Sequence, residues 1–126
     1  MSDKTRFEKG AETFEKVLGW KPPEEGPAWL KITVENLFGD VWSREGLPVR
    51  DRRLVTLTIL CTMLKEDSLR PHLEAALKSG DLGKKELREL MIHVAHYAGW
   101  PVGQFGYDVL MKTVAELQAE GVTLRP

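Results

Sequence analysis

The sequence of 126 residues contains one cysteine, Cys61, so an intrachain disulfide cannot form. Its longest apolar stretch, from Leu54 to Leu64, is about half of the ~20 residues that a membrane-spanning helix needs, and three threonines interrupt it. The first residues also lack the apolar run of a signal peptide. We therefore expect a cytoplasmic protein without a membrane segment.

An excess of charge of one sign is also lacking, because 18 Lys and Arg residues balance 19 Asp and Glu residues. No overall field would attract nucleic acid or an anionic membrane surface, so neither is expected as a partner. The sequence has no low-complexity tract and no repeat of fixed period. At this length we expect a single domain, residues 1–126, with a buried core.

Apolar residues recur at helical spacing along most of the chain, and glycines and prolines divide this pattern into segments. The prolines of the segment Trp20–Pro27 break the chain after the first helix, Ser68 is expected to cap the fourth helix, and Gly80 to stop it. No alternating pattern indicates a strand, so the predicted fold class is all-α with about six helices. The expected helices span residues 4–18, 28–38, 48–64, 69–79, 84–98 and 101–120.

Several ordered motifs resemble those of one known family. They are Gly39–Leu47 (GDVWSREGL), Asp51–Leu57 (DRRLVTL), Arg70–Leu73 (RPHL) and His93–Pro101 (HVAHYAGWP). With these motifs the chain resembles the carboxymuconolactone decarboxylase family over nearly its whole length. The resemblance implies orthogonally packed helices in the fold of the alkylhydroperoxidase D relatives, assembled as a homotrimer or homohexamer.

The resemblance also implies an activity, that of a carbon–carbon lyase that decarboxylates a small lactone-like carboxylic acid in aromatic-compound breakdown. Such a substrate carries its own electron sink, so no metal or organic cofactor is expected. Two alternatives remain open at this point: a family member with another small substrate, and a non-catalytic oligomeric protein that binds a ligand. The redox relatives need a Cys-x-x-Cys pair before a histidine, and the matching positions here are Lys65 and Ser68, so a disulfide-based peroxidase is not expected.

Three residues are candidates for the chemistry. His72 occupies the place of the family histidine at the edge of an apolar stripe, and we expect it to donate the proton. His93 could donate to an oxyanion or act as a second acid, and Arg53 could grip a carboxylate with its planar fork. The alternative for His72 is a half-buried histidine hydrogen-bonded to a carbonyl.

Further residues are expected to contact the substrate, a small molecule. Arg50 is a second candidate for a carboxylate, and for it as for Arg53 the alternative is surface ion pairing with Asp51 and Glu45. His96 points away from the row formed by His93 and Tyr97, so no metal site is expected, and His96 is expected at a subunit contact or exposed. The other candidate pocket residues, with packing in the core or at an interface as the alternative, are Trp42, Tyr97, Trp100 and Gln104.

Overall fold

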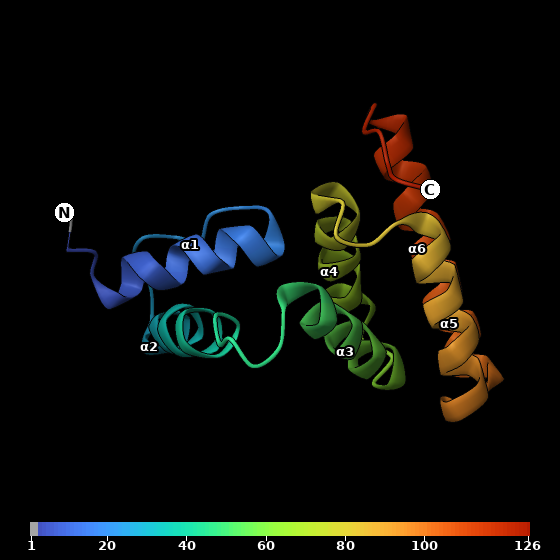
Figure 1. Cartoon of the computed structure of the whole chain (residues 1–126), viewed down its shortest axis with the longest axis horizontal. Helices are drawn as coiled ribbons and strands as arrows, with labels where there is room; N and C mark the ends of the chain where they lie inside the picture. The colour runs from blue at the N-terminus through green and yellow to red at the C-terminus, as the bar shows by residue number, and fades with distance from the viewer. Residues whose placement is uncertain (1–2) are drawn as a thin grey trace. The chain divides into compact units, whose positions relative to one another are not determined.

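Every regular element in residues 3–126, the part of the chain that the computed structural model describes, is helical (Figure 1). The elements are α1 (Arg6–Leu18), α2 (Ala28–Ile32), η1 (Thr33–Val41), α3 (Val49–Thr62), α4 (Glu66–Ser79), α5 (Lys84–Ala98) and α6 (Trp100–Ala119). Because α2 continues directly into η1, the two elements form one continuous helix. The prediction of an all-α fold with about six helices is confirmed. No helix within these residues is both long and apolar enough to cross a bilayer.

The chain divides into two compact units, the first ending at Arg52 and the second beginning at Arg53. In the first unit, α1 begins where the Thr5 Oγ1 accepts the Glu8 N–H over 3.1 Å, and it ends at Gly19, whose φ is +84°. The prediction of a single domain stays a prediction.

Close backbone contact between α1 and η1 organises the first unit. A Cβ atom at Gly10 would lie 2.1 Å from the carbonyl oxygen of Val34, and one at Gly39 would lie 3.2 Å from the Gly10 Cα. Only glycine at position 10 allows this approach, because the obstructing atom belongs to the backbone. Around it, Phe14 and Phe38 pack edge to face with centroids 4.7 Å apart in a small aromatic core.

The second unit has an aliphatic core drawn from α3, α4, α5 and α6. Helices α5 and α6 lie side by side (Figure 1), joined by Gly99 with φ +106°. Gly103 permits their close approach, because a Cβ there would lie 2.4 Å from the Ala95 Cβ. The residues that follow α6 fold back onto this unit, where Leu124 is buried in the core and the Arg125 carbonyl accepts the Lys84 N–H over 3.1 Å.

Some helix ends differ from the prediction. The second helix does not stop at Gly39 but continues to Val41 with the wider turns of a π-helix, because Gly39 packs against Gly10 instead of ending the helix. The fourth helix begins at Glu66, so Ser68 lies in its first turn and is not its cap. Gly80 ends that helix with φ +78°, as predicted.

Candidate functional site

Arg53 is a buried charged residue of the second unit, and His72 is a half-buried histidine of the same unit. Arg53 projects from α3 with a side chain that is 1% exposed, and His72 is half-buried on α4 with a buried Nδ1. Burial, and to a lesser extent the positive charge of Arg53, together lower the pKa of His72 from 6.5 to about 4. The imidazole is therefore neutral at pH 7 in the free protein.

Asp81 is the acidic partner of Arg53. Its Oδ2 accepts the Arg53 Nε–H over 2.9 Å, and it lies in the loop between α4 and α5. A buried guanidinium is tolerated only when it is paired, so this ion pair accounts for a charge among apolar side chains. Sequence reasoning missed Asp81, because a polar loop residue 28 positions away from Arg53 carries no pattern that would link the two.

Cys61 is fully buried among apolar side chains of the same unit. Its Sγ lies 3.8 Å from the Sδ of Met91, and burial raises the pKa of the thiol to about 11. Because the thiolate is the nucleophilic form, this cysteine is unreactive at neutral pH.

The other two histidines lie on exposed positions of α5. The rings of His93 and Tyr97 stack with centroids 5.0 Å apart, and Tyr97 is 84% exposed. His96 is exposed as well, with Nδ1 2.7 Å from the Ile92 carbonyl oxygen and its ring edge to face with Trp100. The sequence left two possibilities for His96, a subunit contact or an exposed position. In the single chain His96 is exposed.

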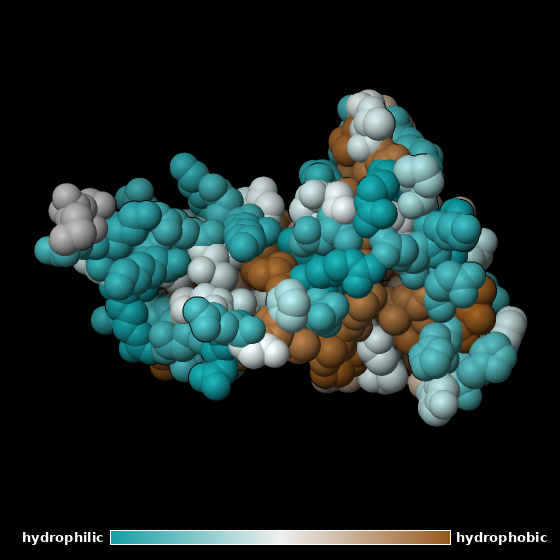
Figure 2. All heavy atoms as spheres, in the orientation of Figure 1, coloured by the Kyte–Doolittle hydropathy of each residue, from teal (hydrophilic) through white to brown (hydrophobic). Residues whose placement is uncertain are grey.

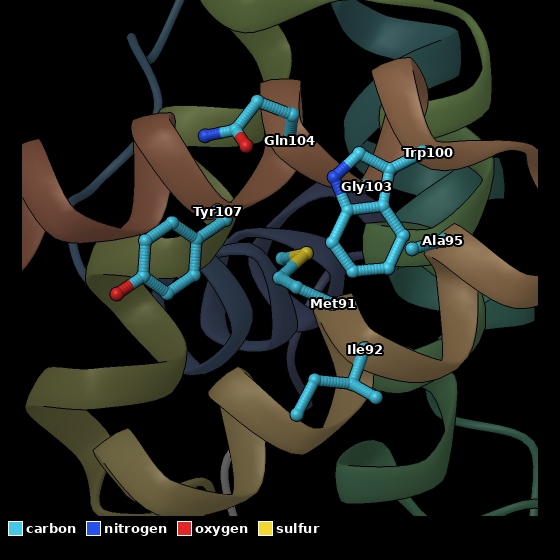
Figure 3. Close-up of a pocket in the computed structure, with 7 residues that line it drawn as sticks. All are labelled: Met91, Ile92, Ala95, Trp100, Gly103, Gln104 and Tyr107. Carbon is cyan, nitrogen blue, oxygen red and sulfur yellow. The ribbon is translucent and has the colours of Figure 1, made fainter.

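A pocket of about 230 Å³ lies between α5 and α6 (Figure 3). In the view of Figure 3, the Met91 side chain is seen between the rings of Trp100 and Tyr107. Gln104 also lines the pocket, and its Nε2 donates to the Asp108 carboxylate over 2.8 Å. The complete lining is Met91, Ile92, Ala95, Trp100, Gly103, Gln104 and Tyr107.

The candidate residues therefore occupy separate places. His72 and Arg53 form one pair, His93 and Tyr97 stack on α5, and Trp100 and Gln104 line the pocket, whose lining contains neither member of the first pair. The remaining two candidates belong to the first unit.

In that unit, Trp42 is buried in the aromatic core, stacked on Phe38 with centroids 6.3 Å apart. The Nη1 of Arg50 lies 3.8 Å from the Asp51 carboxylate on the surface. Trp42 is therefore a core residue, and Arg50 is part of a surface ion pair. Both positions match the alternatives that the sequence left open. Within residues 3–126, no three His, Cys, Asp or Glu side chains are grouped as they would be around a metal ion.

Comparison with known proteins gives a consistent set of relatives. The family described as "Carboxymuconolactone decarboxylase family" matches residues 27–110. The 4-carboxymuconolactone decarboxylase of Acinetobacter baylyi is 37% identical over an alignment of 116 positions, covering 80% of this chain and 81% of the relative. The nitrosuccinic acid decarboxylase npaB of Metarhizium robertsii is 32% identical over 117 positions, covering 93% of this chain and 80% of the relative.

Proposed function

Because the chain belongs to the carboxymuconolactone decarboxylase family, we propose that it is a cofactor-free carboxy-lyase that removes one carboxyl group from a small dicarboxylic acid. The two relatives are both named as decarboxylases, and their named substrates differ. The reaction class is therefore better supported than any one substrate.

The two named substrates have a chemical feature in common. Each carries a carboxyl group on a carbon from which electrons can pass to an acceptor, and each retains a second carboxyl group. In 4-carboxymuconolactone the acceptor is the unsaturated lactone, and in nitrosuccinic acid it is the nitro group. A protein acting on such acids has to hold a carboxylate, exclude water and protonate carbon.

The observation that carries the proposal is the placement of a half-buried imidazole beside a buried guanidinium. Arg53 would bind a substrate carboxylate, and His72 would supply the proton. The carbon–carbon bond to the departing carboxylate breaks, its electron pair moves into the acceptor, and carbon dioxide leaves. The pair then returns to carbon, which takes the proton from the imidazolium.

The low pKa of His72 is compatible with this reaction if the substrate carboxylate supplies a negative charge near the imidazole. A bound carboxylate would offset the positive charge of Arg53, the smaller of the two causes, and its negative charge near the buried ring would itself favour the imidazolium. The pKa of His72 would therefore rise as the acid binds. His93, Tyr97, Trp100 and Gln104 remain proposed as further substrate contacts, whereas Trp42 and Arg50 have the core and ion-pair positions described above.

We also propose that the protein works as a homo-oligomer, a homotrimer or homohexamer. On α3, Val55 and Ile59 are four residues apart and 51% and 50% exposed, and Figure 2 shows apolar surface over this helix. On α6, Trp100, Tyr107 and Met111 are also exposed. Apolar side chains gathered on helix faces are typical of surfaces that a second subunit covers.

The proposed reaction is tested by offering the purified protein 4-carboxymuconolactone and, separately, nitrosuccinic acid, and measuring carbon dioxide against a protein-free control. We expect release from at least one acid. Release from nitrosuccinic acid alone would favour the alternative of a family member with a different substrate. Binding of both acids without release would support the non-catalytic alternative and contradict the proposed reaction.

A further inference from the structure

The loop that carries Asp81 is the part of the second unit on which the Arg53 ion pair depends. It follows α4 at Gly80 and leads into α5 through Leu82 and Gly83. Leu82 is fully buried, and the Asp81 N–H donates to the Ser79 Oγ over 3.2 Å. These contacts fix the ends of the loop, but the Asp81 side chain is 37% exposed.

Arg125 holds this loop from the segment that follows α6. Its Nε donates to the Gly80 carbonyl over 3.0 Å, and its Nη2 donates to the Asp81 carbonyl over 3.2 Å. The same Nη2 lies 2.6 Å from the Glu86 Oε1, which also accepts the Gly83 N–H over 3.0 Å. One guanidinium thus joins two loop carbonyls to the first turn of α5.

The segment that carries Arg125 is itself anchored. Leu124 is buried in the core, and the Lys84 N–H donates to the Arg125 carbonyl. Gly83 lies so close to this segment that a Cβ atom there would be 2.1 Å from the Pro126 carbonyl oxygen. The contact therefore has the close backbone packing of an ordered element, and Arg125 is presented to the loop from a fixed position.

We propose that Arg125 is a positioning residue that, through the Gly80–Gly83 loop, holds Asp81 against Arg53. It so sets the orientation of the guanidinium and how far a carboxylate offsets its positive charge. The effect of Arg125 on catalysis rests on the proposed function, whereas its structural coupling to Arg53 through the loop does not. The contacts run from Arg125 to the loop carbonyls and from Asp81 to the Arg53 Nε. The last step, from the Arg53 charge to His72, is electrostatic and needs no direct contact.

The variant Arg125→Lys tests the positioning role of this residue separately from its positive charge. Arg125→Lys keeps the positive charge but has no planar fork with which to reach two carbonyls and a carboxylate at once. Asp81 would then neutralise Arg53 less well, and the imidazolium of His72 would become less favourable. Asp81→Asn should act in the same direction, and Arg88→Lys, at an exposed arginine on α5, is the matched control.

The coupling can be measured without turnover. The chain has three histidines, so NMR titration with His93→Gln and His96→Gln for assignment isolates the His72 ring signal. We expect its titration midpoint to fall by about half a pH unit or more in Arg125→Lys and in Asp81→Asn, and to stay unchanged in Arg88→Lys. Arg125→Lys should cause no further shift in the Asp81→Asn background, because both act through one carboxylate.

Steady-state kinetics gives the second readout. Since the His72 imidazolium is proposed to supply the proton, a lower titration midpoint in Arg125→Lys should reduce kcat/KM roughly threefold to tenfold, and Arg88→Lys should leave it unchanged. An unchanged His72 midpoint in folded Arg125→Lys, or an undiminished shift in the Asp81→Asn background, would overturn the positioning role. A shifted midpoint with no turnover of any acid would instead contradict the proposed function and leave the positioning role standing.

Discussion

The neutral imidazole of His72 links protein stability to pH. Burial and the Arg53 charge keep its pKa at about 4 in the folded protein, against 6.5 for an unperturbed histidine. As pH falls below 6.5, the unfolded chain binds a proton before the folded protein does, so the free energy of unfolding decreases. The contribution of this residue is fully present above pH 6.5 and is lost as pH falls toward 4.

We predict that His72→Gln reduces the acid sensitivity of the fold. Between pH 7 and pH 4.5, the wild type should lose on the order of 1–2 kcal/mol more unfolding free energy than the variant, because the variant has no imidazole to protonate. Urea denaturation of both proteins at the two pH values measures the difference. Equal losses would mean that the imidazole is not held neutral by its surroundings.

A second prediction concerns Cys61. Cys61→Ala should leave turnover nearly unchanged and lower the unfolding free energy by about 1–2 kcal/mol, because the thiol only fills space beside Met91. Denaturation and carbon dioxide release on the same preparation test both parts. Loss of turnover by a folded variant would make the thiol a participant in the reaction.

Single positions differed in how well the sequence predicted them. His72 and Arg53 could be named as candidates because each stands at the border of an apolar helical stripe and matches a family motif, and their roles stay predictions. Asp81 and Arg125 were not identified, since their importance comes from contacts across 28 and about 45 positions of the chain. Such contacts depend on how a loop and a terminal segment pack, which has no periodic signature.

At the scale of helices, the pattern predicts an element best where local signals and packing agree. The helix of residues 84–98 has the predicted bounds, because its apolar stripe, its Gly83 start and its Gly99 end all act locally. The second helix was predicted to stop at Gly39, yet a packed partner keeps that glycine helical. A glycine alone does not tell a helix end from a close helix contact.

The contact between α1 and η1 gives a prediction at this scale. Gly10→Ala should destabilise the protein by about 1–3 kcal/mol, because the new methyl group meets the Val34 backbone, and this outweighs the roughly 1 kcal/mol by which alanine favours a helix. Gly46→Ala, where nothing lies within 4 Å of the added Cβ, should change stability by less than about 0.5 kcal/mol. Thermal unfolding followed by circular dichroism compares them, and equal stability of the two variants would contradict the close contact.

For the whole molecule, the exposed apolar faces lead to a prediction about assembly. Light scattering at micromolar concentration should give the mass of three or six chains, and Ile59→Lys should shift the distribution toward smaller species, since it places a charge on the exposed face of α3. Lys85→Arg, on an exposed position of α5, is the control that should leave the mass unchanged. A monomeric mass for the wild type would contradict the proposed assembly.

The protein is proposed to release carbon dioxide from a small acid, with His72 supplying the proton. The measurement is the rate of carbon dioxide release by the wild type, His72→Ala and His96→Ala, with circular dichroism and scattering mass on the same preparations. Loss of a general acid should slow His72→Ala by ~10²–10⁴ with fold and assembly kept, and His96→Ala should matter less. A folded His72→Ala that turns over at nearly the wild-type rate would contradict the role of His72 as the acid and pass that role to His93.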